Sequence, residues 1–136
     1  MTTTNYINTF IAVAEDCPVN TAEVPTKKGE KPTVATLQYD MISKHPYKYD
    51  SDAVIFNVYA EKNDLTKMEM PAEKEKFFSK GQACLRASPL TKRYGWGVHS
   101  NEKGKVAIYA VESEEYAKLS KDKNLQHVKA MRSSKK

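Results

Sequence analysis

Two stretches of the chain alternate between apolar and polar or small residues with the two-residue period of a β-strand. They run from Arg93 to His99 and from Lys105 to Val111, and the five residues Ser-Asn-Glu-Lys-Gly join them. A short link that contains glycine is typical of a β-hairpin. If His99 pairs with Lys105, side-chain alternation puts an apolar series on one side: Tyr94, Trp96, Val98, Val106, Ile108 and Ala110. We expect this side to be core.

The reverse side of the predicted hairpin holds two glycines. Gly95 and Gly97 flank the only tryptophan of the chain. Glycine inside a strand usually marks the close approach of another group, such as a helix, an aromatic ring or a ligand. The assumed register sets Gly95 opposite Tyr109, whose ring would cover the glycine backbone. We expect packing to explain both glycines and keep a bound ligand as the alternative.

Helical spacing and capping residues predict a helix after Thr33, whose hydroxyl is suited to the N-cap. Val34, Leu37 and Met41 form an apolar stripe at helical spacing. The helix is expected to end at His45, because the residue before a proline avoids the α conformation.

The segment from Ser51 to Asp64 fits two patterns. Its residues 54, 56, 58 and 60 are apolar and alternate as in a strand, but residues 54 with 58 and 55 with 59 also form pairs at helical spacing. Ser51 and Asp52 are good capping residues and favour a helix from about Asp52 to Lys62.

Two further helices and two further strands are predicted along the chain. Proline at position 71 and glycine at position 81 bound one helix. Ser113, followed by two acids, opens the other, and Leu125, Val128 and Met131 would prolong it. The strands are Tyr6 to Ala14, which is β-branched and aromatic, and Gln82 to Ala87. The polar segment 15–33 contains three prolines and is expected to be an ordered loop.

These elements predict an α+β fold with an antiparallel sheet and helices packed on one face. A chain of 136 residues is the size of one domain. We place a single compact domain at residues 1–124 and a basic, partly flexible extension at 125–136. From Lys118 onward, seven Lys and Arg residues stand against one acid. This end lacks interleaved aromatic residues, so a solubilising role is favoured over nucleic-acid binding.

The composition indicates a soluble, cytoplasmic protein. No apolar run approaches the roughly 20 residues of a membrane-spanning helix, and the N-terminus lacks the basic start of a signal peptide. Cys17 and Cys84 stand alone, without a second cysteine or a histidine at metal-ligand spacing. We therefore expect free thiols, no bound metal and no cofactor.

Several blocks of the sequence resemble a small bacterial family of uncharacterised proteins, a domain of unknown function. The blocks are NTFIAVAEDCP, ATLQYDMI, PYKYDSDAVIFNVYAEK, FFSKGQACLRASPLTKRYGWGVH and KVAIYAVESEEY. The resemblance covers most of the chain and implies a bacterial, cytoplasmic α+β protein. It implies no activity, so no functional residue is transferred from it.

The residues favour binding of a small anion or a phosphate-containing ligand. Arginine offers a planar fork of donors, lysine a point charge, and histidine a group that titrates near neutrality. The predicted ligand-binding residues are Arg86, Arg93, His99, Lys105 and Tyr109. An enzyme is the first alternative, with His99, Glu112 and Glu114 as acid–base groups and Cys84 or Ser88 as nucleophile, although no known catalytic motif occurs. Weak nucleic-acid binding through the basic end is the second alternative, and it is disfavoured because Tyr94 and Trp96 are expected in the core.

Overall fold

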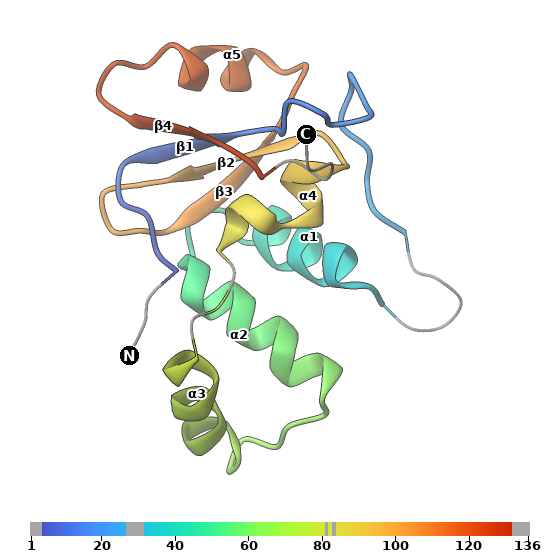
Figure 1. Ribbon diagram of the computed structural model, residues 1–136, viewed down its shortest axis with the longest axis vertical. Coiled ribbons are helices and arrows are strands. Elements are labelled where there is room, and N and C mark those ends of the chain that lie inside the picture. Colours follow the sequence, from blue (N-terminus) through green and yellow to red (C-terminus); the bar gives the residue numbers. More distant parts are fainter. Residues whose placement is uncertain (1–3, 27–31, 81, 83, 132–136) are drawn as a thin grey trace.

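The fold is built on a four-stranded mixed sheet in the computed structural model, which describes residues 4–26, 32–80, 82 and 84–131 (Figure 1). Its strands lie in the order β3 (Val106–Ala110), β2 (Trp96–Ser100), β1 (Thr9–Ala12) and β4 (Gln126–Lys129). The pairs β1–β2 and β2–β3 are antiparallel, whereas β1 and β4 are parallel. The α+β class is confirmed. The sheet is mixed rather than antiparallel as predicted, because β4 pairs with β1 in parallel.

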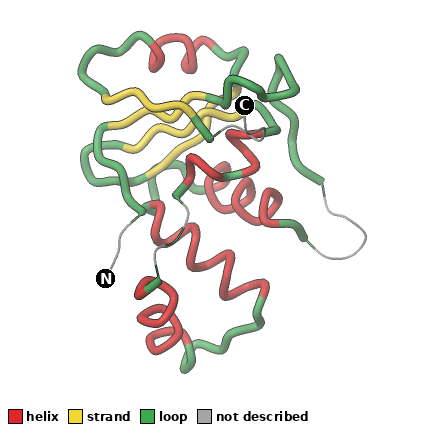
Figure 2. Tube along the Cα trace, viewed as in Figure 1, coloured by secondary structure: helices red, strands yellow, loops and turns green. Residues whose placement is uncertain are grey.

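Helices lie on both faces of the sheet rather than on one (Figures 1 and 2). On one face α1 (Val34–Lys44) contacts β3, and the short α4 (Pro89–Lys92) contacts β2. On the other face α5 (Glu114–Ser120) contacts β1 and β3. Helix α2 (Ser51–Lys62) packs on α1, and α3 (Met70–Ser79) packs on α2, away from the sheet.

Local capping explains where the two central helices begin. The Thr33 hydroxyl accepts the Thr36 backbone N–H, and the Thr36 side chain accepts the Thr33 N–H, a reciprocal capping box. Helix α1 ends at the expected position, with His45 as its C-cap. The side chain of Asp50 caps α2 by accepting the Ala53 N–H at 2.8 Å, which confirms the helical interpretation of this ambiguous segment.

The hairpin has the predicted faces but a register shifted by two residues. Trp96 pairs with Ala110, and Val98 pairs with Ile108. The turn is shorter than the five-residue link, because Asn101 already pairs through its N–H with the Lys105 carbonyl at 2.9 Å. Since the shift is even, Trp96 and Val98 still face the core.

The segment before the hairpin differs from its prediction. The described residues of the predicted strand 82–87 do not form a strand and instead contain a 3₁₀ helix, η1 (Leu85–Ala87). Ser88 then caps α4 through its hydroxyl, and Arg93 is the C-cap of this helix rather than the first residue of a strand. Strand β1 is also shorter than the predicted 6–14, and the predicted helix cap at Gly81 lies outside the described residues.

Strand β4 replaces the predicted extension of the last helix. Helix α5 begins at its predicted Ser113 cap and ends at Ser120. Residues Gln126–Lys129 then run parallel to β1, and Ala130 is 4% exposed in the core. The folded part of the chain thus continues past the boundary predicted at residue 124.

Two apolar clusters hold the fold together. The larger lies between the sheet and helices α1, α2 and α4, and its fully buried members include Ile11, Ile42, Leu90 and Val98. The smaller lies between α2 and α3 and centres on Phe56, Ala60 and Phe78. The second cluster joins α3 to α2 without contributing to the packing of the sheet.

Candidate ligand-binding site

Neighbouring side chains and backbone cover both glycines around Trp96. A Cβ atom added at Gly97 would lie 2.6 Å from Cε2 of Tyr116 and 2.7 Å from Cζ of Phe10. One added at Gly95 would lie 3.0 Å from Cγ2 of Val19 and 3.1 Å from the Ala22 Cα. The packing explanation is confirmed, and the two glycines do not form an open floor for a ligand.

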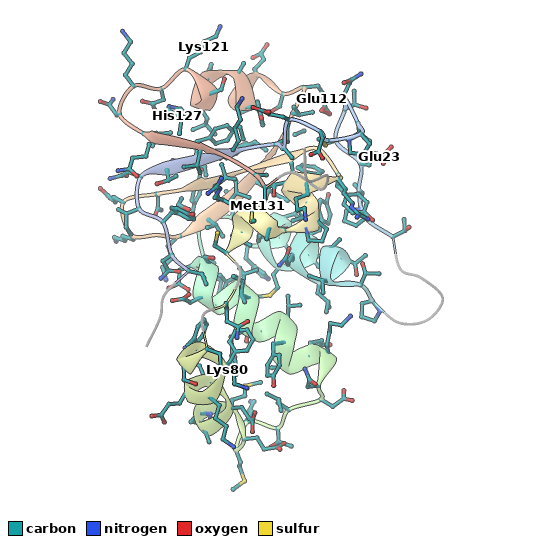
Figure 3. All side chains as sticks on the ribbon, viewed as in Figure 1. Glu23, Lys80, Glu112, Lys121, His127 and Met131 are labelled. Atoms are coloured by element: carbon teal, nitrogen blue, oxygen red, sulfur yellow. The ribbon has the colours of Figure 1, made fainter. Side chains whose placement is uncertain are left out.

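The polar loop before α1 is ordered where it crosses this region, as predicted. The Trp96 indole N–H donates to the Glu23 carbonyl at 2.8 Å, and the Glu23 N–H donates to the Tyr94 carbonyl at 2.8 Å. The Ala22 N–H donates to a carboxylate oxygen of Glu112 at 2.9 Å. Figure 3 shows Glu23 and Glu112 on this side of the molecule, near the end of the sheet. These bonds hold the loop against the segment around Trp96, and the Glu112 carboxylate takes part in them.

Two of the predicted ligand-binding residues meet through a residue that was not predicted. The Tyr47 hydroxyl lies 2.8 Å from Nδ1 of His99 and 2.6 Å from the Tyr109 hydroxyl. Tyr47 reaches them from the loop between α1 and α2 with a backbone φ of +60°, which is uncommon for a residue with a side chain. Hydrogen bonds between this loop and the backbone of Val106 fix it along β3.

Burial controls the protonation of this cluster. It lowers the pKa of His99, an effect that the nearby Asp122 carboxylate opposes. Burial also raises the pKa of Tyr47, and the hydrogen bond with Tyr109 raises it further. A neutral imidazole can accept the Tyr47 proton at Nδ1, which leaves the Tyr109 hydroxyl as donor to Tyr47. The arrangement suits a neutral hydrogen-bonded chain.

The three remaining predicted residues lie on other elements. Arg86 is in η1 and donates from Nε to the Lys129 carbonyl at 2.7 Å. Arg93 is exposed at the end of α4, and Lys105 directly precedes β3. The joint anion site of these residues with His99 and Tyr109 stays a prediction.

A cleft of about 350 Å³ lies between α1, α2 and the segment that contains η1 and the start of α4. Its volume falls in the range of small-molecule pockets. Among the described residues of its lining there is no Asp or Glu, and Lys62 is the one charged residue. The lining residues are Val34, Gln38, Ile55, Val58, Tyr59, Lys62, Asn63, Gln82, Cys84, Ala87, Ser88 and Pro89.

A buried polar pair forms part of the wall of this cleft. Gln38 is 6% exposed and Ser88 is 4% exposed. The Ser88 hydroxyl donates to Oε1 of Gln38 at 2.5 Å and accepts the Leu90 N–H at 3.1 Å. Among the described residues, Nε2 of Gln38 has no hydrogen-bond partner, and it is not sealed from the cleft. The cleft therefore offers a fixed donor in a largely apolar wall.

Cys84 adds a thiol to the same lining. Its Sγ lies 3.5 Å from the Tyr6 hydroxyl, which is not part of the lining. Burial is the main cause that raises the pKa of Tyr6; the bond to Cys84 adds to it, and the neighbouring Arg86 guanidinium opposes it. Sulfur, hydroxyl and guanidinium thus form one group at this side of the cleft.

A larger cavity on another side of α2 lacks such a buried donor. Its volume is about 570 Å³, and its charged lining residues, Glu61 and Asp64, are exposed to solvent. None of its buried lining residues is polar. The smaller cleft is thus the better candidate for a specific ligand.

Two classes of site find no support in the part of the chain that the structure describes. No three His, Cys, Asp or Glu side chains there are grouped to hold a metal ion. None of the helices there combines the length and the apolar character needed to cross a membrane.

The fold is that of a small α+β protein, and the cleft beside α1 and α2 is its candidate ligand-binding site. Residues 1–136, the whole chain, match the model of the family described as "Family of unknown function (DUF6157)", and the protein belongs to this family. No curated protein and no solved structure matches the chain. The resemblance to a family of unknown function is thus confirmed, and the family assigns no activity.

Proposed function

We propose that the protein binds a small organic acid in the cleft between α1, α2 and residues 84–89. The observation that carries this proposal is the Nε2 group of Gln38, a donor on a largely buried side chain of the cleft wall that has no hydrogen-bond partner among the described residues. The atom keeps some contact with solvent, so it is free to donate to a molecule that enters the cleft. A ligand oxygen can accept this N–H in largely apolar surroundings, where a hydrogen bond is stronger than in water, so the cleft favours molecules with a carbonyl or carboxylate group.

The rest of the lining selects the body and the charge of the ligand. Val34, Ile55 and Val58 present apolar side chains, which suit a short aliphatic or aromatic body. Lys62 is the only charged residue in the described part of the lining and is exposed, so its attraction for an anion is weak. The described lining residues include no Asp or Glu that would attract a cation. Carboxylates with a small apolar body fit these conditions best.

Two-dimensional ¹H–¹⁵N NMR with a set of defined probes tests the proposal. Butyrate, hexanoate and benzoate should shift the signals of Gln38, Ser88 and their neighbours. Gln38→Met keeps the volume and removes the donor, so it should weaken hexanoate binding about tenfold, the value of one well-placed hydrogen bond. Gln126→Met changes the same residue type on the exposed strand β4 and is the matched control.

Inorganic phosphate distinguishes the cleft from the anion site predicted from the sequence. If phosphate shifts His99, Lys105 and Tyr109 while the carboxylates leave Gln38 unchanged, the predicted anion site is favoured and the cleft proposal is wrong. The absence of any shift near Gln38 at millimolar carboxylate would also contradict the proposal.

A further inference from the structure

Cys84 gives the proposed cleft a nucleophile as well as a hydrogen-bond donor. We propose that Cys84 adds covalently to an α,β-unsaturated carbonyl compound with an apolar body that occupies the cleft. This inference rests on the proposed function, because it uses the same pocket. It goes further by naming the reactive class of ligand and the atom to which that ligand becomes attached.

The surroundings of Cys84 are those of a reactive thiol. The side chain is partly exposed and lines the cleft. The Tyr6 hydroxyl approaches the sulfur to 3.5 Å, and the Arg86 guanidinium acts on the same hydroxyl. Reactive cysteines occur in partly exposed, electropositive surroundings of this kind, because the thiolate is the nucleophile. Tyr6 and Arg86 are absent from the cleft lining, so they support the sulfur without filling the space of a ligand.

Gln38 provides the second requirement of a conjugate addition. Gln38 lines the same cleft, and its Nε2 group, which has no hydrogen-bond partner among the described residues, can donate to the carbonyl oxygen of the ligand. Such a donor stabilises the negative charge that develops on this oxygen when the sulfur attacks. The cleft therefore combines a thiol with a donor for the oxygen of an enone.

The step balances without a further reactant. The thiol first gives up its proton, and Sγ forms a bond to the β-carbon of the ligand. The electron pair of the carbon–carbon double bond moves toward the carbonyl oxygen and gives an enolate. A proton equivalent to the one released then adds to the α-carbon. The product is a thioether with a saturated carbonyl group, and neither partner is oxidised or reduced overall.

Cys17 is the internal control, because it is also a free cysteine with intermediate exposure but does not line the cleft. The protein is treated with 4-phenyl-3-buten-2-one, an apolar enone, and separately with acrylamide, a small electrophile. Peptide mass spectrometry then gives the rate of modification at each cysteine. The enone should modify Cys84 at least about tenfold faster than Cys17, as expected from one productive hydrogen bond to the bound carbonyl group. Hexanoate should slow the reaction at Cys84 and leave Cys17 unchanged.

Two variants separate the role of the donor from that of the sulfur environment. Gln38→Met should slow the enone reaction at Cys84 about tenfold and affect the acrylamide reaction less, because the donor acts on a bound carbonyl group. Tyr6→Phe removes the hydroxyl beside the sulfur and should slow both electrophiles. Gln126→Met should change neither rate.

The inference would be overturned if the enone modified the two cysteines at equal rates or if Gln38→Met left the enone rate unchanged. Hexanoate binding to a Cys84→Ser variant shows which claim has failed. If the variant binds hexanoate at Gln38 while Cys84 of the unmodified protein shows no preference, the covalent chemistry is wrong and the proposed function stands. If hexanoate does not bind, the proposed function fails as well.

Discussion

Replacing Gly97 with alanine tests the packing of α5 on the sheet through the sign of its effect. The φ angle of Gly97 is not in the left-handed region. On an uncrowded strand, alanine would therefore stabilise the protein by about 0.5–1 kcal/mol. Here the new Cβ would lie 2.6 Å from the ring of Tyr116 and 2.7 Å from the ring of Phe10, which is fully buried. Such overpacking costs about 1–3 kcal/mol.

The effect should exceed simple crowding because Tyr116 is also held at its other end. Its hydroxyl accepts the Val13 N–H at 3.0 Å, and movement of the ring would weaken that bond by about 1 kcal/mol. The stabilisation that alanine gives on an uncrowded strand offsets part of these costs. We therefore expect Gly97→Ala to lower the free energy of unfolding by about 1–3 kcal/mol in total.

Urea unfolding followed by the fluorescence of Trp96, the only tryptophan, measures this change. Tyr116→Leu provides the companion variant: with a smaller side chain over Gly97, the alanine should cost at least about 1 kcal/mol less, as a coupling between contacting residues. An increase in stability on Gly97→Ala alone would refute the close contact of α5 with β2. Equal costs in both backgrounds would show that Tyr116 is not the obstructing group.

Three further changes have defined outcomes. Tyr47→Phe removes the hydroxyl shared by His99 and Tyr109, so the free energy of unfolding should fall by about 1–3 kcal/mol; an unchanged urea midpoint would contradict the cluster. Because burial lowers the pKa of His99, the unfolded chain binds that proton more readily. The contribution of His99 should thus be complete above about pH 6.5 and decrease as the pH falls. His99→Gln should reduce this decrease, and an NMR titration in which His99 is protonated at or above the ordinary histidine range would disprove the assignment. Asp50→Ala removes the cap of α2 and should cost about 1 kcal/mol in thermal unfolding, more than Asp50→Asn; equal effects would argue against the cap.

The sequence predicted those parts of the fold that depend on local interactions. Thr33 and Pro46 determine the ends of α1 through groups close to them in the chain. The hairpin register required one tertiary detail: Oδ1 of Asn101 accepts the N–H groups of Lys103 and Lys105, both at 2.9 Å. This tightens the turn and moves the pairing by two residues. The left-handed Gly104, with φ of +78°, completes the short loop.

Strand β4 was missed because little in its sequence distinguishes it from an exposed segment. Three of its four residues are exposed, and Val128 is the one apolar residue of the four and packs against the larger cluster. Its place in the sheet depends on backbone pairing with β1, far away in the sequence. The period of apolar residues along the chain reports on side chains and carries no information about backbone pairing between distant segments.

The candidate site was predicted only in part for a related reason. Alternation along the strands put His99 and Tyr109 on a common face, and they meet there. Tyr47 was missed, because its left-handed backbone and its position beside β3 follow from tertiary contacts. Gln38 was missed because polar residues in a helix are usually taken as exposed, whereas this one is a buried residue of α1 that accepts a hydrogen bond from Ser88. Among the lining residues of the cleft, Cys84 and Ser88 had been named, but as outside candidates for a nucleophile.

The position of β1 between β2 and β4 has a consequence for synthesis on the ribosome. This strand is synthesised before both of its neighbours, because its antiparallel neighbour begins at residue 96 and its parallel neighbour at residue 126. Until those segments are made, Phe10 and Ile11 have neither neighbouring strand to pair with, although helix caps such as that of α1 can already form. Pairing across such long separations is slow and leaves strand edges exposed. The sheet should therefore be completed only when β4, the fourth strand along the chain, pairs with β1, the first.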